Sequence, residues 1–177
     1  MKNTVTSISL AVALVFAVAM LFTTAAEAKK GKGERPYIAP TITAEQAIST
    51  VKTSLSRLTA GKSFVKTGKR GESNLEVVLV LDGKIVSRIR LNPATGEILS
   101  KGQKVMVQQV SASKDQAVKI VQQAIPNLEV ASVQLGKEGE WKVDLTLRKA
   151  VVATINVHGG DGSILPDWKA FRDASMY

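Results

Sequence analysis

The chain repeats itself, and this repeat constrains the fold more than any other feature of the sequence. Thr43–Ile48 (TAEQAI) returns 70 residues later as Ser113–Val118 (SKDQAV). Further along, Gly96–Leu99 (GEIL) returns 66 residues later as Gly162–Leu165 (GSIL). Similarity at a nearly fixed spacing is typical of tandem structural units. Because the spacing falls from 70 to 66, we expect the second unit to have a shorter link between its helix and its strands, where loops tolerate deletions.

Each unit begins with a predicted helix. Thr43 and Ser113 are each followed three residues later by a glutamine, which is a capping-box arrangement. Gly61 and Pro126 then mark the helix ends. Between these signals, apolar residues at helical spacing form one face of each helix. They are Ala47, Ile48, Val51, Leu55 and Leu58 in the first helix, and Ala117, Val118, Val121, Ala124 and Ile125 in the second.

The rest of each unit alternates with the period of two that β-strands show. Leu75–Leu81 and Trp141–Leu147 are the clearest examples, and Asp82-Gly83 after the first is a strong hairpin signal. We expect an additional first strand near 63–69 and near 129–135. The sequence therefore predicts an α+β fold of two tandem repeats, each with one helix packed on a three- to four-stranded antiparallel β-meander.

Residues 1–28 have the three parts of a secretory signal peptide. Lys2 supplies positive charge, 8–22 is almost wholly apolar, and Ala26-Glu27-Ala28 is the small-x-small pattern before a cleavage site. The apolar run is shorter than the ~20 residues that span a bilayer, and a retained membrane anchor is the alternative. We expect cleavage after Ala28 and a periplasmic or secreted protein without an integral membrane span.

The rest of the chain divides into four parts: a flexible basic leader at 29–41, the two units at 42–103 and 104–166, and a C-terminal tail at 167–177. The chain has no cysteine, so disulfides contribute nothing to its stability. Units this small lie near the lower limit for an independent hydrophobic core, so we expect the two to pack together.

The repeated motifs resemble the PepSY family. Its members begin with a helix start like Thr43–Ile48 and close with a turn and strand like Asn92–Leu99 (NPATGEIL). The second copy, Ser113–Val118 followed by His158–Leu165, has His158 where the family has an acidic or amide residue. The likeness covers about 42–100 and 111–166. It implies an α+β module found in protease propeptides and in envelope proteins that regulate peptidases or cell-wall enzymes, without catalytic residues of its own.

The sequence offers little for catalysis. His158 is the single histidine and lies in a glycine-rich turn, where turn formation explains it better than a zinc site or a catalytic triad. Cysteine chemistry is excluded, and no spacing singles out a carboxylate pair among Asp144, Asp161, Asp167 and Asp173. We therefore expect a non-enzymatic protein with no catalytic, metal-binding or cofactor-binding residues.

Two binding functions remain open. The first is an exported binding module that contacts a peptide or an envelope enzyme, such as a protease, through a sheet edge and the tail, and that inhibits or regulates it. In the tail, Trp168 and Phe171 are candidate anchors, and we expect the fold not to need 167–177; a short helix docked on its own unit is the alternative. The second is a basic adaptor for anionic polymers or a membrane surface, since the net charge is +9. Its candidate residues are Lys29, Lys30, Lys32 and Arg35 of the leader. No nucleic acid is expected, because the few aromatic residues form no stacking platform.

Export is directly testable. Because Ala26-Glu27-Ala28 precedes the expected cleavage site, N-terminal sequencing of the protein recovered from cells should start at Lys29. A stable product that starts at Met1 and sediments with membranes would instead indicate the retained anchor.

Overall fold

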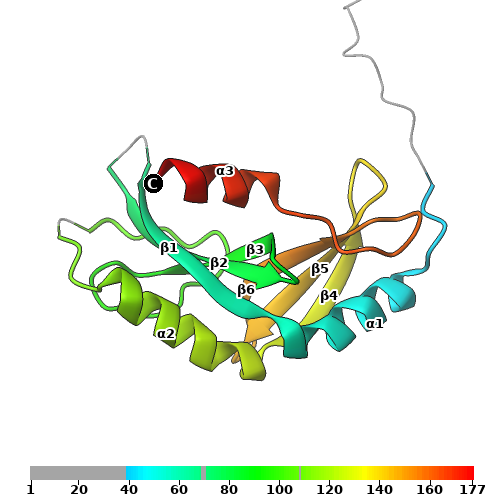
Figure 1. Ribbon diagram of the computed structural model, residues 1–177, viewed down its shortest axis with the longest axis horizontal. Helices are drawn as coiled ribbons and strands as arrows, with labels where there is room; N and C mark the ends of the chain where they lie inside the picture. Colours follow the sequence, from blue (N-terminus) through cyan, green and yellow to red (C-terminus); the bar gives the residue numbers. More distant parts are fainter. Residues whose placement is uncertain (1–38, 69–70, 108) are drawn as a thin grey trace, which may run out of the picture. The chain divides into compact units, whose positions relative to one another are not determined.

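The computed structural model describes residues 39–68, 71–107 and 109–177, and the description below is confined to them. The expected signal peptide and nearly all of the expected leader lie outside this part. The described chain is α+β, with three α-helices and two three-stranded antiparallel sheets (Figure 1). None of the described helices has the length and apolar character needed to cross a membrane.

The elements follow one another in two similar series. The first is α1 (Ala44–Ser54), the 3₁₀ turn η1 (Leu55–Arg57), β1 (Thr59–Thr67), β2 (Ser73–Leu81) and β3 (Lys84–Leu91). The second is α2 (Lys114–Ala124), η2 (Ile125–Asn127), β4 (Glu129–Leu135), β5 (Trp141–Leu147) and β6 (Ala150–Val157). A third helix, α3 (Trp168–Met176), ends the chain.

Both long helices begin where the sequence predicted. The Thr43 hydroxyl accepts from the Gln46 amide while the Gln46 side chain accepts from the Thr43 amide, which completes a capping box. The Ser113 hydroxyl accepts from the Gln116 amide in the same way. These bonds satisfy amides that the first helical turn leaves without an intrahelical partner.

The two sheets have matching registers. The strand orders are β1-β2-β3 and β4-β5-β6. Leu75 faces Leu91 in the first sheet, and Trp141 faces Val157 in the second. Ile98 and Ile164 each add one isolated bridge, to Leu91 and Val157, so each sheet has three strands, within the expected range of three to four.

The four-residue change in spacing lies in a hairpin and not in the helix-to-strand link, so the expected position of the deletion was wrong. A single residue, Leu58 or Leu128, joins each 3₁₀ turn to the next strand. β1 and β2 have nine residues each, whereas β4 and β5 have seven. The first hairpin is therefore two residues longer on each arm.

Tight turns join the second and third strands of each sheet. Asp82 and Gly83 both have positive φ, at 48° and 78°, as the Asp-Gly pair predicted for a mirror-image hairpin turn. Arg148 and Lys149 adopt the same conformation, with φ of 51° and 68°. Non-glycine residues in this region cost about 1 kcal/mol or more each, so the strand pairing on either side must hold the second turn in place.

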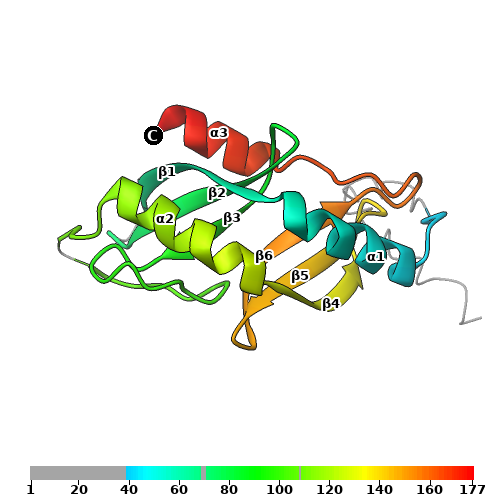
Figure 2. The same cartoon turned by 60° about the horizontal axis from the view of Figure 1, so that its bottom comes forward.

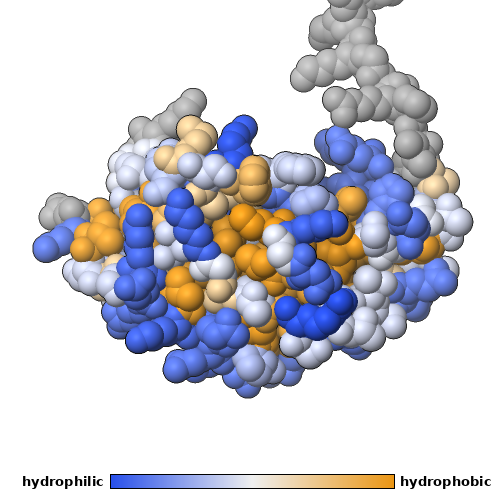
Figure 3. All heavy atoms as spheres, in the orientation of Figure 1, coloured by the Kyte–Doolittle hydropathy of each residue, from blue (hydrophilic) through white to orange (hydrophobic). Residues whose placement is uncertain are grey.

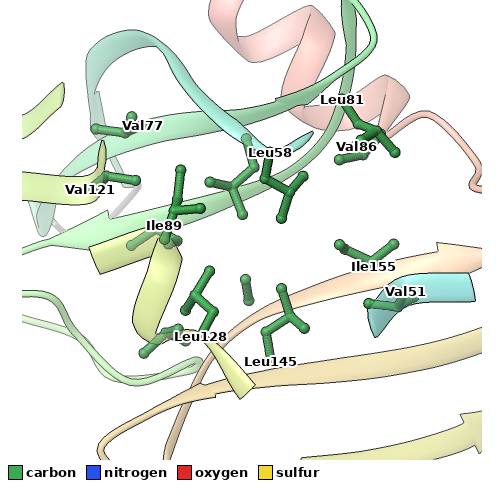
Figure 4. Packing of buried hydrophobic residues seen from close by; sticks show 14 of the residues in the cluster. Val51, Leu58, Val77, Leu81, Val86, Ile89, Val121, Leu128, Leu145 and Ile155 are labelled. Atoms are coloured by element: carbon green, nitrogen blue, oxygen red, sulfur yellow. The ribbon is translucent and has the colours of Figure 1, made fainter. Parts of the chain in front are cut away.

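The helices are exchanged between the two sheets, which the sequence analysis did not predict. The main contacts of α1 are with β4, β5 and β6 of the second sheet, and those of α2 are with β1 and β2 of the first (Figures 1 and 2). In Figure 4 Val51 of α1 lies near Ile155 of β6, while Val121 of α2 lies near Val77 of β2. One hydrophobic cluster runs through both halves, so 42–103 and 104–166 do not have separate cores.

The two sheets also meet along β3 and β6, which contact each other without forming a paired ladder. The amide of Lys101 donates to the carbonyl of Val151 at 2.6 Å, and the amide of Asp167 donates to the carbonyl of Ile85 at 2.8 Å. The Ser87 hydroxyl adds a bond of 2.8 Å to the carbonyl of Thr154. Each half thus sends the segment after its last strand across to the other half.

The exchange predicts where core substitutions act. Val51→Ala and Val121→Ala should each lower the free energy of unfolding by about 2 kcal/mol, because both side chains are fully buried. NMR shift changes from Val51→Ala should concentrate in β4–β6, and those from Val121→Ala in β1 and β2. The exposed neighbour Lys52→Ala is the control and should change little. Shift changes confined to the meander that follows each helix would contradict the exchanged packing.

Candidate functional site

The C-terminal tail is an ordered helix that packs on the first sheet. The Asp167 carboxylate caps α3 by accepting from the Ala170 amide at 2.9 Å. Ala170 and Ala174 face inward and form a small second core with Phe64 and Val78 on the outer face of that sheet. The expectation that the fold does not need 167–177 was therefore wrong, since removing α3 would uncover this face. The helix also docks on the first unit and not on its own.

Buried charges hold α3 in place. The Asp173 carboxylate, whose side chain is 4% exposed, accepts from Lys66 Nζ at 2.5 Å and from Arg88 Nη1 at 2.8 Å. Arg88 also donates to the buried Glu76 at 2.8 Å. Lys62 Nζ donates to the carbonyl of Ala174 at 2.5 Å. These contacts join α3 directly to β1 and β3, and through Arg88 to Glu76 of β2.

The pKa of Asp173 reflects this arrangement. Burial acts to raise the pKa of its carboxyl group, but the hydrogen bonds and positive charges of Lys66 and Arg88 outweigh burial and bring the pKa below its ordinary value. Burial likewise acts to lower the pKa of Arg88, and the surrounding carboxylates, Glu76 foremost, raise it overall. Asp173 and Arg88 therefore both stay charged at neutral pH.

The outward face of α3 carries the two aromatic residues that the sequence singled out. Trp168 and Phe171 are 69% and 51% exposed, and their rings meet edge to face with centroids 6.1 Å apart. The structure brings this pair together and leaves it free of the core. Lys29, Lys30, Lys32 and Arg35, the other candidate binding residues, lie outside the described residues.

The outer faces of the two sheets differ in chemistry. Where the first sheet has Val78 under α3, the second has Asp144. The Asp144 carboxylate accepts from Thr154 at 2.6 Å, Ser132 at 3.1 Å and Lys101 at 3.2 Å. Burial acts to raise the pKa of Asp144, and these bonds bring it below the ordinary value. This polar cluster was not predicted from the sequence, although the alternation of Lys142, Asp144 and Thr146 could have indicated it.

The two outermost strands are protected to different degrees. β1 carries Lys62 and Lys66, and the side-chain oxygen of Gln122 on α2 accepts from its Ala60 amide at 2.8 Å. In β4, by contrast, Val130–Leu135 contains no charged residue and no proline. Among the described strands β4 pairs with β5 alone, so β4 is an edge strand of the second sheet. An uncharged edge strand can pair with a further extended chain, which most proteins prevent by placing lysine or proline there. Figure 3 shows hydrophobic side chains reaching the surface between the layer of α1 and α2 and the layer of α3.

Two clefts lie at matching places. The larger, of about 1000 Å³, lies between the end of α2, the segment after β3 and the β5–β6 turn. The smaller, of about 290 Å³, lies at the end of α1, where Arg57 and Asp82 pair at 2.8 Å. Arg148 takes the place of Asp82 in the larger cleft and has no ion-pair partner among the described residues. Glu97 and Glu129 line this cleft near the C-terminal end of α2, where the helix dipole favours a positive group.

His158 takes part in turn formation, as the sequence indicated. Its ring nitrogen lies 2.9 Å from the Asp161 carboxylate, which also accepts from the amide and hydroxyl of Ser163. The bonds from Ser163 are the main cause that brings the pKa of Asp161 down to about 2. No group of three histidine, aspartate or glutamate residues in the described part of the chain could hold a metal ion.

Comparison with known proteins finds no match, whether to a family model, to a curated protein or to a solved structure.

The buried charges predict a pH-dependent role for Asp173. A depressed pKa stabilises the fold above the ordinary carboxyl value, and this contribution is lost as the pH falls through the folded-state pKa. Asp173→Asn should therefore lower the free energy of unfolding by about 3 kcal/mol at pH 7. The difference from the parent protein should shrink below about pH 4. Urea unfolding across this range measures it, with the exposed Asp115→Asn as control; a difference that does not change with pH would contradict the assignment.

Proposed function

We propose that this chain is an exported, non-enzymatic binding module made of two PepSY-like units, which binds an extended peptide segment of an envelope protein and thereby inhibits or regulates a peptidase or cell-envelope enzyme. Two matching turns support the likeness to PepSY. The amide of Gly96 donates to the carbonyl of Asn92, and that of Gly162 to the carbonyl of His158. Both glycines have positive φ, of 76° and 75°. The repeat motifs thus lie at turns of the same geometry.

The edge of β4, which has no charged residue and no proline at 130–135, is the observation that carries the proposed binding mode. An extended peptide that pairs with β4 gains main-chain hydrogen bonds without displacing any element of the fold. Exposed Gln134 and Leu135 lie along the strand and can contact the side chains of such a peptide. The opposite edge strand, β1, has its lysines and a side-chain bond to α2, so β4 is the more favourable edge.

The larger cleft suggests what the peptide contains. Glu129 is the first residue of β4 and also lines this cleft, so the edge and the cleft are continuous. A peptide paired with β4 can therefore place one side chain in the cleft. Glu97, Glu129 and the C-terminal end of α2 attract a positive group, whereas Arg148, which has no ion-pair partner among the described residues, attracts a negative one. The cleft therefore suits a polar side chain of the peptide.

The basic adaptor remains the alternative function. It would bind anionic envelope polymers or a membrane surface through Lys29, Lys30, Lys32 and Arg35. Salt distinguishes the two, because binding by exposed charges weakens steeply as ionic strength rises and main-chain pairing at β4 does not.

In-cell photo-crosslinking tests the peptide-binding proposal. A photoreactive residue in place of exposed Gln134 on β4 should form an adduct with an envelope protein, whereas one in place of exposed Thr67 on β1 should not. Added to the purified protein, the identified partner or its peptide should slow hydrogen exchange at β4 amides and should be inhibited or activated in its own assay.

Three outcomes would overturn the proposal. They are equal adducts at Gln134 and Thr67, a partner that leaves exchange at β4 unchanged, and an adduct of the chain with a second copy of itself. The last would show that the β4 edge joins two copies.

A further inference from the structure

The outward face of α3 carries large apolar side chains, although the packing contacts of the helix are made by its opposite face. Ala170, Asp173 and Ala174 face the sheet and make the packing contacts. Trp168, Phe171 and Met176 are 69%, 51% and 69% exposed. Large apolar side chains gathered on one exposed surface commonly mark a docking site.

Positively charged side chains lie beside these apolar residues, whereas the two aspartates of this segment are engaged in contacts within the fold. Lys169 and Arg172 are exposed on α3 between the apolar residues. Lys84 is exposed beside Ile85, whose carbonyl accepts from the Asp167 amide at the start of the helix. Asp167 is used as the helix cap, and Asp173 is buried against Lys66 and Arg88. Among the exposed residues of 168–177 there is no carboxylate side chain.

We propose that this face of α3 docks on the surface of an anionic phospholipid bilayer. Trp168, Phe171 and Met176 would enter the boundary between headgroups and acyl chains, where aromatic side chains are favoured. Lys169 and Arg172 would lie at the level of the lipid phosphates.

The chemistry of the face favours this occupant over the others. A soluble polyanion would satisfy the two cations but would offer no apolar phase for Trp168 and Phe171. An anionic bilayer supplies both, and the net charge of +9 draws the protein toward it. The buried ion pairs of Asp173 hold α3 on the first sheet by the face opposite to Trp168 and Phe171, so α3 can dock without leaving the sheet. α3 lies over the first sheet and β4 at the edge of the second, so docking leaves the proposed peptide site free (Figures 1 and 2). This inference does not depend on the proposed function.

Binding to lipid vesicles tests the proposal, with the protein purified in the form that accumulates in cells. The protein should cosediment with vesicles of phosphatidylcholine mixed with phosphatidylglycerol and much less with vesicles of phosphatidylcholine alone. Trp168→Gln with Phe171→Gln should abolish measurable binding, and Lys169→Gln with Arg172→Gln should weaken it roughly tenfold or more. Tryptophan fluorescence should shift to shorter wavelength on binding in the parent protein. Trp168→Phe should bind without that shift. The remaining tryptophan, Trp141, donates its ring N–H to the carbonyl of Ile42 within the fold, so its surroundings should not change on binding.

Matched controls separate this face from charge or apolarity in general. Lys52→Gln with Lys119→Gln removes two exposed cations from α1 and α2, and Leu135→Gln removes an exposed apolar side chain from β4. All variants should melt like the parent protein, and these controls should bind vesicles unchanged. The proposal is overturned if the controls lose as much binding as the α3 variants, or if neutralising Lys29, Lys30, Lys32 and Arg35 alone abolishes binding. It is also overturned if the protein does not distinguish the two kinds of vesicle, or if the aromatic variants bind as the parent protein does.

Discussion

The shared hydrophobic core is the constraint on which the rest of the structure depends. Each sheet buries its inner face against the helix of the other half, so Val51 of α1 lies over β4–β6 and Val121 of α2 over β1 and β2. Units of this size can bury only a limited apolar area alone, and no cysteine is present to compensate. Because the helices are exchanged, each half supplies the helix that completes the hydrophobic core of the other. We therefore expect the described chain to unfold as one cooperative unit.

Short connections explain why the helices are exchanged. Leu58 alone joins η1 to β1, and Leu128 alone joins η2 to β4. A helix that covers the strand following it must reverse direction, which normally takes a loop of several residues. With one linking residue, the helix continues away from its own meander and meets the other one. In the first unit the first strand was expected to start near residue 63, which allowed a longer loop than the chain has, whereas the strand expected near 129–135 was confirmed.

Local signals in the sequence predicted local structure well. The Thr43 capping box, the Asp82-Gly83 hairpin and the alternation of Leu75–Leu81 each depend on residues close together in the chain, and each was confirmed. Such local signals could not predict which sheet each helix packs on, because both helices have the same apolar pattern. Trp168 and Phe171 lie exposed on α3, and their role as anchors stays a prediction. The inward face of α3 was missed because its small residues give a weak signal, although Phe64 and Val78 indicated that the first sheet needs a cover.

The inner faces of the two halves match, while their outer faces and edges differ. The first half has an outer face covered by α3, with Phe64 and Val78 beside the charges of Glu76 and Arg88, and an edge strand with lysines. The second half has the Asp144 cluster and the uncharged edge of β4. Core packing requires the inner faces to stay complementary, because each covers the helix of the other half. No such requirement acts on the outer faces. The differences therefore lie where the fold permits them, and the two proposed contacts fall on different halves: lipid at α3 on the first sheet, and peptide at β4 on the second. Since α3 is held by Asp173, Ala170 and Ala174 and not by Trp168 or Phe171, a loss of either contact should leave the other intact.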